Sequence, residues 1–338
     1  MRKKQLLAQG LRYSGALSLL NHAWWGEDRL TVLAYHRITD IHADDFYGLA
    51  SNVSATPEDF DAQMSFIGAN FNVISLDQLR EFILNDTALP KRPLLITFDD
   101  GYRDNYDNAL PILKKHGFPA VIFTVTGRMN DPSPLWWDLC AQAFRETTLK
   151  TADLPYIGVR EISEASQDEF IEVIKTHPTK QMDESIEKLC IALEVTPSKQ
   201  ALFFGWDEVR ELVANGVACQ PHTVNHPILT RIDLAQGIQE LTQSRDDLLE
   251  HTEQIVDTFA YPNGSPVDYD KETILALRDL GYKMAVTLSP GPERLEMVKR
   301  YPLQIRRVYL SNSDTLDIFA SKVMGIPALT TKDSYLEI

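Results

Sequence analysis

Two clusters of ionisable residues, far apart in the chain, carry the side chains best suited to chemistry. Asp99 and Asp100 follow an apolar run in the segment TFDDG, and His222 and His226 lie four residues apart in HTVNH. One carboxylate and two imidazoles can bind a divalent cation and leave positions open for water and substrate. The second carboxylate would then be free to act as a base. The two clusters together predict a hydrolytic metal site.

Each cluster also has a plainer interpretation. FDDG alone is typical of a turn or a helix N-cap, and two surface histidines at this spacing arise by chance. At positions i and i+4 the imidazoles would lie on one face of a helix. Pro227 disfavours helical backbone at His226, so a turn leading into a helix is the alternative. An aspartate with two neutral imidazoles fits Zn²⁺, and also Fe²⁺, Co²⁺ or Ni²⁺.

The elements around these clusters would bring them to one place. Apolar runs alternate with helical patterns, which predicts βα units and a mostly parallel sheet. Strands are expected at 30–36, 72–75, 93–100, 120–125, 217–220, 256–262, 283–288 and 304–310, and helices at 57–70, 76–84, 106–116, 206–215, 234–250, 270–280 and 315–323. Catalytic groups of α/β barrels lie at the C-terminal ends of strands. His36, which ends the first strand, is therefore expected on the same face as the two clusters.

The alternation lapses between residues 128 and 205, which we expect to form a largely helical insertion. The chain then divides into an N-terminal amphipathic segment over 1–29, a barrel over 30–325 that contains the insertion, and a C-terminal tail over 326–338. Trp136, in the insertion's LWWDL, could form a lid that stacks on a sugar ring. The alternative is that it anchors the insertion to the barrel.

Composition narrows the class of protein. The 338 residues can bury a sizeable core, and a net charge of −15 argues against nucleic acid or an anionic membrane as the main partner. Three cysteines without CxxC spacing indicate neither a disulfide framework nor a thiolate zinc site.

No apolar run approaches the ~20 residues of a membrane span. The basic, Trp-bearing segment 1–25 predicts a helix docked on the core or a peripheral membrane contact. A cytoplasmic location is expected, with export as the alternative.

Four segments, which include the two clusters described above, carry a family resemblance. TFDDGYRDNYDNALPILKKHGFPAVIFTVTG, HTVNH, FAYPNG and GYKMAVTLSPG together resemble the polysaccharide deacetylase family, also called the NodB-homology or carbohydrate esterase 4 family. The resemblance implies a distorted (β/α)7 barrel that removes acetyl groups from N-acetylated sugars with a divalent metal. It implies that Asp100, His222 and His226 are the metal ligands and Asp99 the general base. In FAYPNG it implies an oxyanion donor, which we assign to the backbone amide of Asn263.

The chain departs from the family pattern in two places. Ala260 stands where an arginine commonly orients the base, and no histidine follows His251, although the family commonly places its acid histidine late. The early LAYHRI is similar to the exopolysaccharide and biofilm deacetylase subgroup, in which this histidine comes first. That similarity implies His36 as the acid, against a core histidine at a strand end. It also implies Arg307 as the base-orienting arginine, against a structural ion pair.

Three aromatic residues are candidate substrate or oxyanion contacts: Tyr102, Tyr261 and Trp136. For Tyr102, packing is the alternative. The expected activity is removal of an N-acetyl group from a sugar in a glycan or in a lipid- or nucleotide-linked precursor. One alternative is an amidohydrolase of a small non-sugar amide. The other is a catalytically silent, metal-stabilised glycan-binding module, although such a module would need no base beside its ligands.

Overall fold

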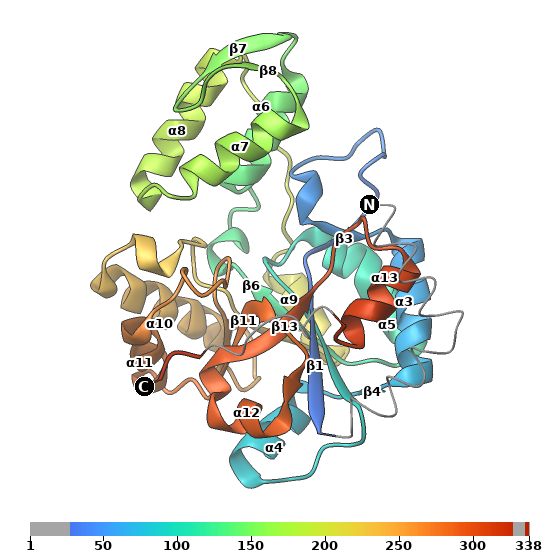
Figure 1. The fold of residues 1–338 in the computed structure, drawn as a ribbon. Helices are drawn as coiled ribbons and strands as arrows, with labels where there is room; N and C mark the ends of the chain where they lie inside the picture. Colours follow the sequence, from blue (N-terminus) through green and yellow to red (C-terminus); the bar gives the residue numbers. More distant parts are fainter. Residues whose placement is uncertain (1–27, 327–334, 338) are drawn as a thin grey trace.

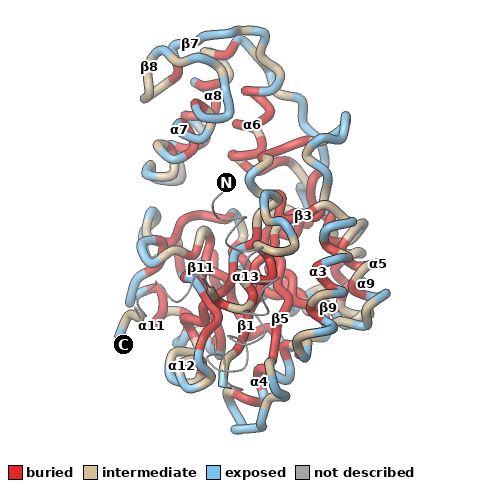
Figure 2. Tube along the Cα trace, turned by 45° about the vertical axis from the view of Figure 1, so that its right-hand side comes forward, coloured by how far each residue is buried: buried red, intermediate tan, exposed pale blue. Residues whose placement is uncertain are grey.

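The computed structural model describes residues 28–326 and 335–337. Its centre is a nearly closed barrel of seven strands, all paired in parallel (Figure 1). In spatial order these are β10 (Thr258–Ala260), β11 (Met284–Pro290), β13 (Ile305–Tyr309), β1 (Arg29–Tyr35), β5 (Pro93–Phe98), β6 (Ala120–Thr124) and β9 (Val217–Pro221). The strands are buried, as apolar runs covered by helices should be (Figure 2). The expected distorted (β/α)7 barrel is confirmed.

The barrel closes between β9 and β10 through a side chain. No ladder joins these two strands in the described part of the chain, and the buried Gln220 bridges them instead. Its amide nitrogen donates to Ile255 O (2.8 Å), and its amide oxygen accepts from Asp257 N (3.2 Å) and Thr258 N (3.1 Å). One glutamine therefore satisfies backbone groups that a continuous sheet would pair.

Helices cover the outside of the barrel, and their ends follow local sequence signals. They are α3 (Pro57–Asn70), α4 (Leu76–Asn85), α5 (Leu110–His116), α9 (Trp206–Ala214), α10 (Leu234–His251), α11 (Lys271–Asp279), α12 (Leu295–Arg300) and α13 (Leu316–Val323). Thr56 caps α3 by accepting from Asp59 N, and Gly117 ends α5 with φ 68°. The helix expected over 106–116 starts instead as a π-turn over Asn105–Ala109. The short α12 was not expected.

The remaining strands are short. They are β2 (Arg37–Ile38), which pairs with β3 (Val53–Ala55), β4 (Asn72–Val73) beside β5, and β12 (Glu293–Arg294) antiparallel to β1.

The insertion forms a lobe above the barrel, at the C-terminal ends of the strands (Figure 1). It consists of α6 (Trp136–Glu146), the hairpin β7 (Thr151–Leu154) and β8 (Gly158–Glu161), α7 (Glu164–Ile174) and α8 (Thr179–Ala192). The helices agree with the largely helical expectation, and the hairpin was not expected. Because both ends of the lobe return to the barrel's upper face, its helices can overhang whatever lies there.

The predictions for the chain ends lie mostly outside the described residues. This holds for the amphipathic segment 1–25 and for most of the tail over 326–338. Of the tail, Leu336 exchanges hydrogen bonds with the side chain of Gln304, and Tyr335 stacks on Tyr301. Between residues 28 and 326, no helix is both long and apolar enough to cross a bilayer.

Candidate active site

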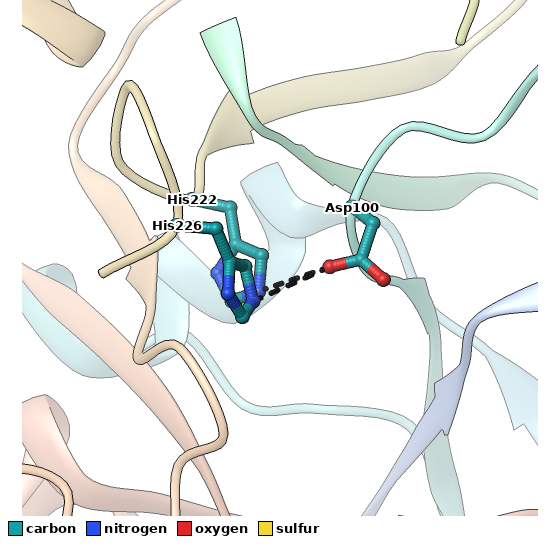
Figure 3. A group of neighbouring side chains, drawn as sticks. All are labelled: Asp100, His222 and His226. Carbon is teal, nitrogen blue, oxygen red and sulfur yellow. Dashed lines mark ion pairs between the residues drawn. The ribbon is translucent and has the colours of Figure 1, made fainter. Parts of the chain in front are cut away.

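Three ligand-type side chains converge above the barrel (Figure 3). Asp100 Oδ1 lies 3.6 Å from His222 Nε2 and 3.4 Å from His226 Nε2. The three side chains are buried, and their ligand atoms lie within 4.8 Å of one another. Asp100 follows β5 and the histidines follow β9, so the C-terminal ends of two strands deliver the set. The structure thus brings together the three residues expected to bind metal.

The chemistry of these donors fits a divalent cation. His222 Nδ1 lies 2.7 Å from Ala260 O, and because a carbonyl oxygen can only accept, Nε2 carries the lone pair that faces Asp100. Burial lowers the pKa of both histidines, which keeps them neutral. Asp100 Oδ1 is buried and has no hydrogen-bond partner among the described residues. Burial, together with Asp99, raises the pKa of Asp100. A cation such as zinc would satisfy this orphaned oxygen.

The two histidines lie on a turn. The backbone from His222 to Ile228 is irregular and leads into a 3₁₀ turn over Leu229–Arg231, so the helical interpretation of HxxxH is wrong and the turn alternative is confirmed. His226 adopts φ 57°, and its N–H donates to Thr223 Oγ1 (2.9 Å). Glu240 on α10 accepts from Val224 N and Asn225 N. These bonds hold the turn where Pro227 excludes a helix.

The other carboxylate, Asp99, is held by an arginine from the last strand. Arg307 Nη1 and Nη2 donate to the two oxygens of Asp99, each at 2.7 Å. Arg307 is itself buried and also donates to Thr287 O and Thr97 Oγ1. Burial alone would raise the pKa of Asp99, but the charge and hydrogen bonds of Arg307 outweigh it and hold that pKa below its usual range. Arg307 thus occupies the orienting position that Ala260 cannot fill.

His36 lies on the other side of Asp99. Its Nε2 is 3.9 Å from Asp99 Oδ2, and its backbone is fixed by Asn105 Nδ2 donating to His36 O (2.7 Å) and by Ser54 Oγ. Burial, opposed by Asp99, lowers the pKa of His36 to about 4. The imidazole is therefore neutral at pH 7. His36 thus faces Asp99 and also lines the adjacent cavity.

One cavity of about 420 Å³ is lined by His36, Asp99, Asp100, His222 and His226, but not by Arg307. Trp136 and Asn263 line it, as expected of a lid and an oxyanion donor. Tyr102 and Tyr261 do not, so their interpretation as substrate contacts needs correction. Both rings are buried, and Tyr261 Oη donates to Leu303 O (2.9 Å) while its ring stacks on Tyr269. Tyr102 lies behind the site.

A buried polar network connects the insertion to the metal centre, and the sequence reasoning missed it. Tyr102 Oη donates to Asp138 Oδ2 (2.9 Å) and accepts from Trp137 Nε1 (2.8 Å). Trp137 in turn presents its ring to His226, with centroids 4.8 Å apart. Asp138 also accepts from Leu49 N. Asp138 is fully buried, and burial raises its pKa to about 6. Helix α6 therefore anchors the insertion and packs against His226, one of the three expected ligands.

A second feature not expected from sequence is the roof of the cavity. Ile171 and Glu172 of α7, with Lys175 and Thr176 just beyond it, line the cavity opposite the carboxylates. Arg231, after the histidine turn, lines it as well. In the sequence these residues belong to ordinary amphipathic or turn segments, and only the folded lobe shows what they face.

Comparison with known proteins gives the family. Residues 86–285 match the polysaccharide deacetylase family. The chain is 22% identical to YxkH of Bacillus subtilis over 264 residues, which covers 78% of this chain and 66% of YxkH. It is 23% identical over 322 residues to the poly-beta-1,6-N-acetyl-D-glucosamine N-deacetylase of Escherichia coli K12, covering 91% of this chain and 40% of that enzyme. The chain thus spans less than two thirds of either relative.

Solved structures share the fold. The Streptococcus pyogenes deacetylase PplD, solved in complex with acetate, aligns with a TM-score of 0.58 at 18% identity. The alignment covers 87% of this chain and 98% of PplD. With a family match over more than half of its length and an Asp–His–His cluster at the strand ends, this chain belongs to the polysaccharide deacetylase family.

Proposed function

We propose that the protein hydrolyses the N-acetyl group of a sugar in a glycan or glycan precursor. The observation that carries this proposal is the pairing of two adjacent carboxylates with different partners. Asp100 faces two imidazole nitrogens, whereas Asp99 is clamped by Arg307 and faces His36. A ligand-forming carboxylate beside a positioned, ionised one is what metal-assisted amide hydrolysis requires. A silent binding module would have no use for the second group.

In this proposal Asp100, His222 and His226 hold one divalent metal, zinc being the best match to two imidazoles and a carboxylate. When bound, the metal supplies Lewis-acid chemistry, polarising a carbonyl and lowering the pKa of a water. Asp99 takes the proton of the attacking water on Oδ2, the oxygen nearest His36. The backbone amide of Asn263, on the cavity wall, is the proposed donor to the oxyanion.

The pKa shifts of Asp99 and His36 set the direction of the proton transfers. Arg307 lowers the pKa of Asp99 below its usual range, and the pKa of His36 is about 4. A proton taken up by Asp99 therefore moves downhill to His36, 3.9 Å away. His36 then protonates the leaving amine as the C–N bond breaks. On this route His36 starts the cycle neutral and is charged only during turnover.

The substrate class follows from the relatives and the cavity. The E. coli relative is named for poly-beta-1,6-N-acetyl-D-glucosamine, and we propose β-1,6-linked N-acetylglucosamine units as the first substrate to test. Trp136 on the cavity wall offers a ring face for a pyranose. We further propose that the protein acts at the inner face of the membrane, through the basic segment 1–25. Sedimentation of the full chain with anionic vesicles, and its loss in Trp24→Ala/Trp25→Ala, tests that location.

The deciding experiment is acetate release from N-acetylglucosamine oligosaccharides, measured with metal content for two matched variants. Asp99→Asn should retain the metal and lose at least ~10²-fold in kcat, because only the base is removed. Asp100→Ala should lose the metal and the activity together. The reverse pattern of metal content would show that the two carboxylates have exchanged roles. A metal-loaded wild-type protein that releases no acetate from these oligosaccharides would point to a lipid- or nucleotide-linked sugar or to the small-amide alternative.

A further inference from the structure

A second cavity adjoins the catalytic one beneath the insertion. It measures about 500 Å³ and lies between the lobe and α10 of the barrel. Trp136 and His226 line both cavities, so the two cavities adjoin at these side chains. Met182 and Ile186 of α8 also line the second cavity. A hollow beneath the lobe therefore lies next to the catalytic cavity.

A third hollow extends the path along α8. This groove, of about 620 Å³, shares Leu139, Ile186, Glu187 and Lys199 with the second cavity. Met182, Ile186 and Cys190 follow one another at i, i+4 and i+8, so a single stripe of α8 lines both hollows. From Met182 to Ile191 the stripe is about 14 Å long at 1.5 Å per residue. The catalytic cavity and the two hollows thus lie in a row, which we call the channel.

The chemistry of the walls changes along this channel. The metal-centre end is polar, with carboxylates and imidazoles. The middle carries Arg128 and Lys199; the Arg128 Nε is buried with no hydrogen-bond partner among the described residues, and Nη1 lies 3.6 Å from Asp131. Glu187 and Glu240 also line the middle, but the Glu240 carboxylate is occupied by backbone N–H groups of the histidine turn.

The outer groove is mainly aliphatic. It is lined by Leu139, Ile186, Cys190, Ile191, Val195 and Pro197, together with Glu187, Glu194, Thr196 and Lys199. Among the described residues that line it, none is aromatic, so it offers no ring face on which a pyranose could stack. Ile191 is 78% exposed, an unusual position for a large aliphatic side chain unless something covers it. Burial of apolar surface would be the main gain of any occupant.

We propose that this channel binds an N-acetyl sugar attached through phosphate to an aliphatic tail, with the sugar at the metal centre, the phosphate near Arg128 and Lys199, and the tail on the α8 groove. The inference rests on the proposed deacetylase function and specifies its substrate as a lipid-linked precursor. Met182 suits such a role, since its flexible thioether adapts to a mobile chain. A free sugar polymer would leave the aliphatic groove exposed.

The test uses the metal-loaded full chain and a matched pair of variants. Ile191→Glu puts a charge into the groove at an exposed position, and Val159→Glu makes the same kind of change at a site on β8, 70% exposed, that lines none of the three hollows. Binding of farnesyl diphosphate, a short soluble isoprenoid diphosphate, is measured by calorimetry beside inorganic diphosphate. For each protein, kcat/KM is also measured for a polyprenyl-diphosphate-linked sugar and for a soluble oligosaccharide. The ratio of these two values is then compared between each variant and the wild type.

Ile191→Glu should weaken farnesyl diphosphate binding at least tenfold and lower the kcat/KM ratio to a similar extent. Val159→Glu should match the wild type, and inorganic diphosphate should bind all three proteins equally. Equal farnesyl diphosphate binding by the wild type and Ile191→Glu would overturn the proposal. So would an effect of Ile191→Glu confined to long oligosaccharides, which would assign the groove to a polymer. Ile191-dependent binding without any deacetylation would refute the proposed activity and leave the lipid site standing.

Discussion

At the scale of single residues, the geometry around Asp99 is the most specific feature of the site. The carboxylate receives two hydrogen bonds of 2.7 Å from one guanidinium, and this paired arrangement fixes its plane as well as its charge. A carboxylate held in this way can face one direction only. For the proposed base, Arg307 would therefore be a positioning residue whose shape matters as much as its charge.

Arg307→Lys should keep the positive charge but lose the paired hydrogen bonds, so we expect kcat to fall by roughly ten- to a hundredfold with metal content unchanged. Arg80→Lys is the matched control, because Arg80 makes an equivalent two-bond pair with Asp257 (2.9 Å each) outside the cavity. Acetate-release kinetics of both variants check this. If Arg307→Lys and Arg80→Lys lost kcat equally, Arg307 would affect activity only by stabilising the fold.

His36 provides a second prediction at this scale. His36→Ala should lower kcat about 10²-fold, because the leaving amine loses its acid, while the metal stays bound. His116→Ala removes a histidine that also faces a carboxylate, Asp61 at 2.7 Å, but lies outside the cavity, and this change should leave kcat unchanged. Single-turnover acetate release and metal analysis of both variants decide the matter. Wild-type turnover by His36→Ala would remove this histidine from the mechanism.

At the scale of elements, α6 joins the insertion to the barrel by burying a carboxyl group. Asp138 accepts hydrogen bonds from Tyr102 Oη and Leu49 N, so its surroundings come from two segments of the barrel. Burial raises its pKa to about 6, against an ordinary value near 4. The folded protein therefore binds a proton here more tightly than the unfolded chain does.

The raised pKa of Asp138 makes the free energy of unfolding depend on pH in a definite direction. Because the folded pKa exceeds the unfolded one, the contribution of Asp138 is greatest at low pH and is lost as the pH rises through about 6. Asp138→Asn cannot titrate. Between pH 4.5 and 7 the wild type should therefore lose about 2 kcal/mol of unfolding free energy relative to Asp138→Asn. Urea unfolding of both proteins at the two pH values measures the difference, and parallel pH profiles would contradict it.

At the scale of the whole molecule, a metal held by Asp100, His222 and His226 would couple metal binding to folding. These residues follow β5 and β9, which lie on different parts of the barrel wall. A metal that binds only the folded chain stabilises it by about 2.7 kcal/mol at a hundred times its Kd. Chelation should therefore lower the melting temperature of the wild type by several degrees. In Asp100→Ala, chelation should change nothing, and a similar shift there would place the metal elsewhere.

The parts of this molecule that the sequence predicts are those with a local signal. Asp99 and Asp100 end an apolar strand and His222 and His226 share one short turn, so spacing alone indicated a site. Arg307 needed the family resemblance, because nothing near it in sequence points to Asp99. Apart from Trp136, the insertion's contribution was not predictable. Asp138 sits in an ordinary amphipathic helix, and its burial depends on residues 36 and 89 positions away.

The pairing of Asp99 with Arg307 also has a consequence for how the protein is made. The two residues are 208 positions apart, and Arg307 lies on β13, the last strand in the described part of the chain. Contacts this distant in sequence form slowly, because a long chain must be ordered before they contribute. Until β13 has been synthesised, Asp99 lacks the guanidinium that pairs with it and must stay hydrated or protonated. Completion of the barrel and pairing of the proposed base with Arg307 therefore coincide, late in folding.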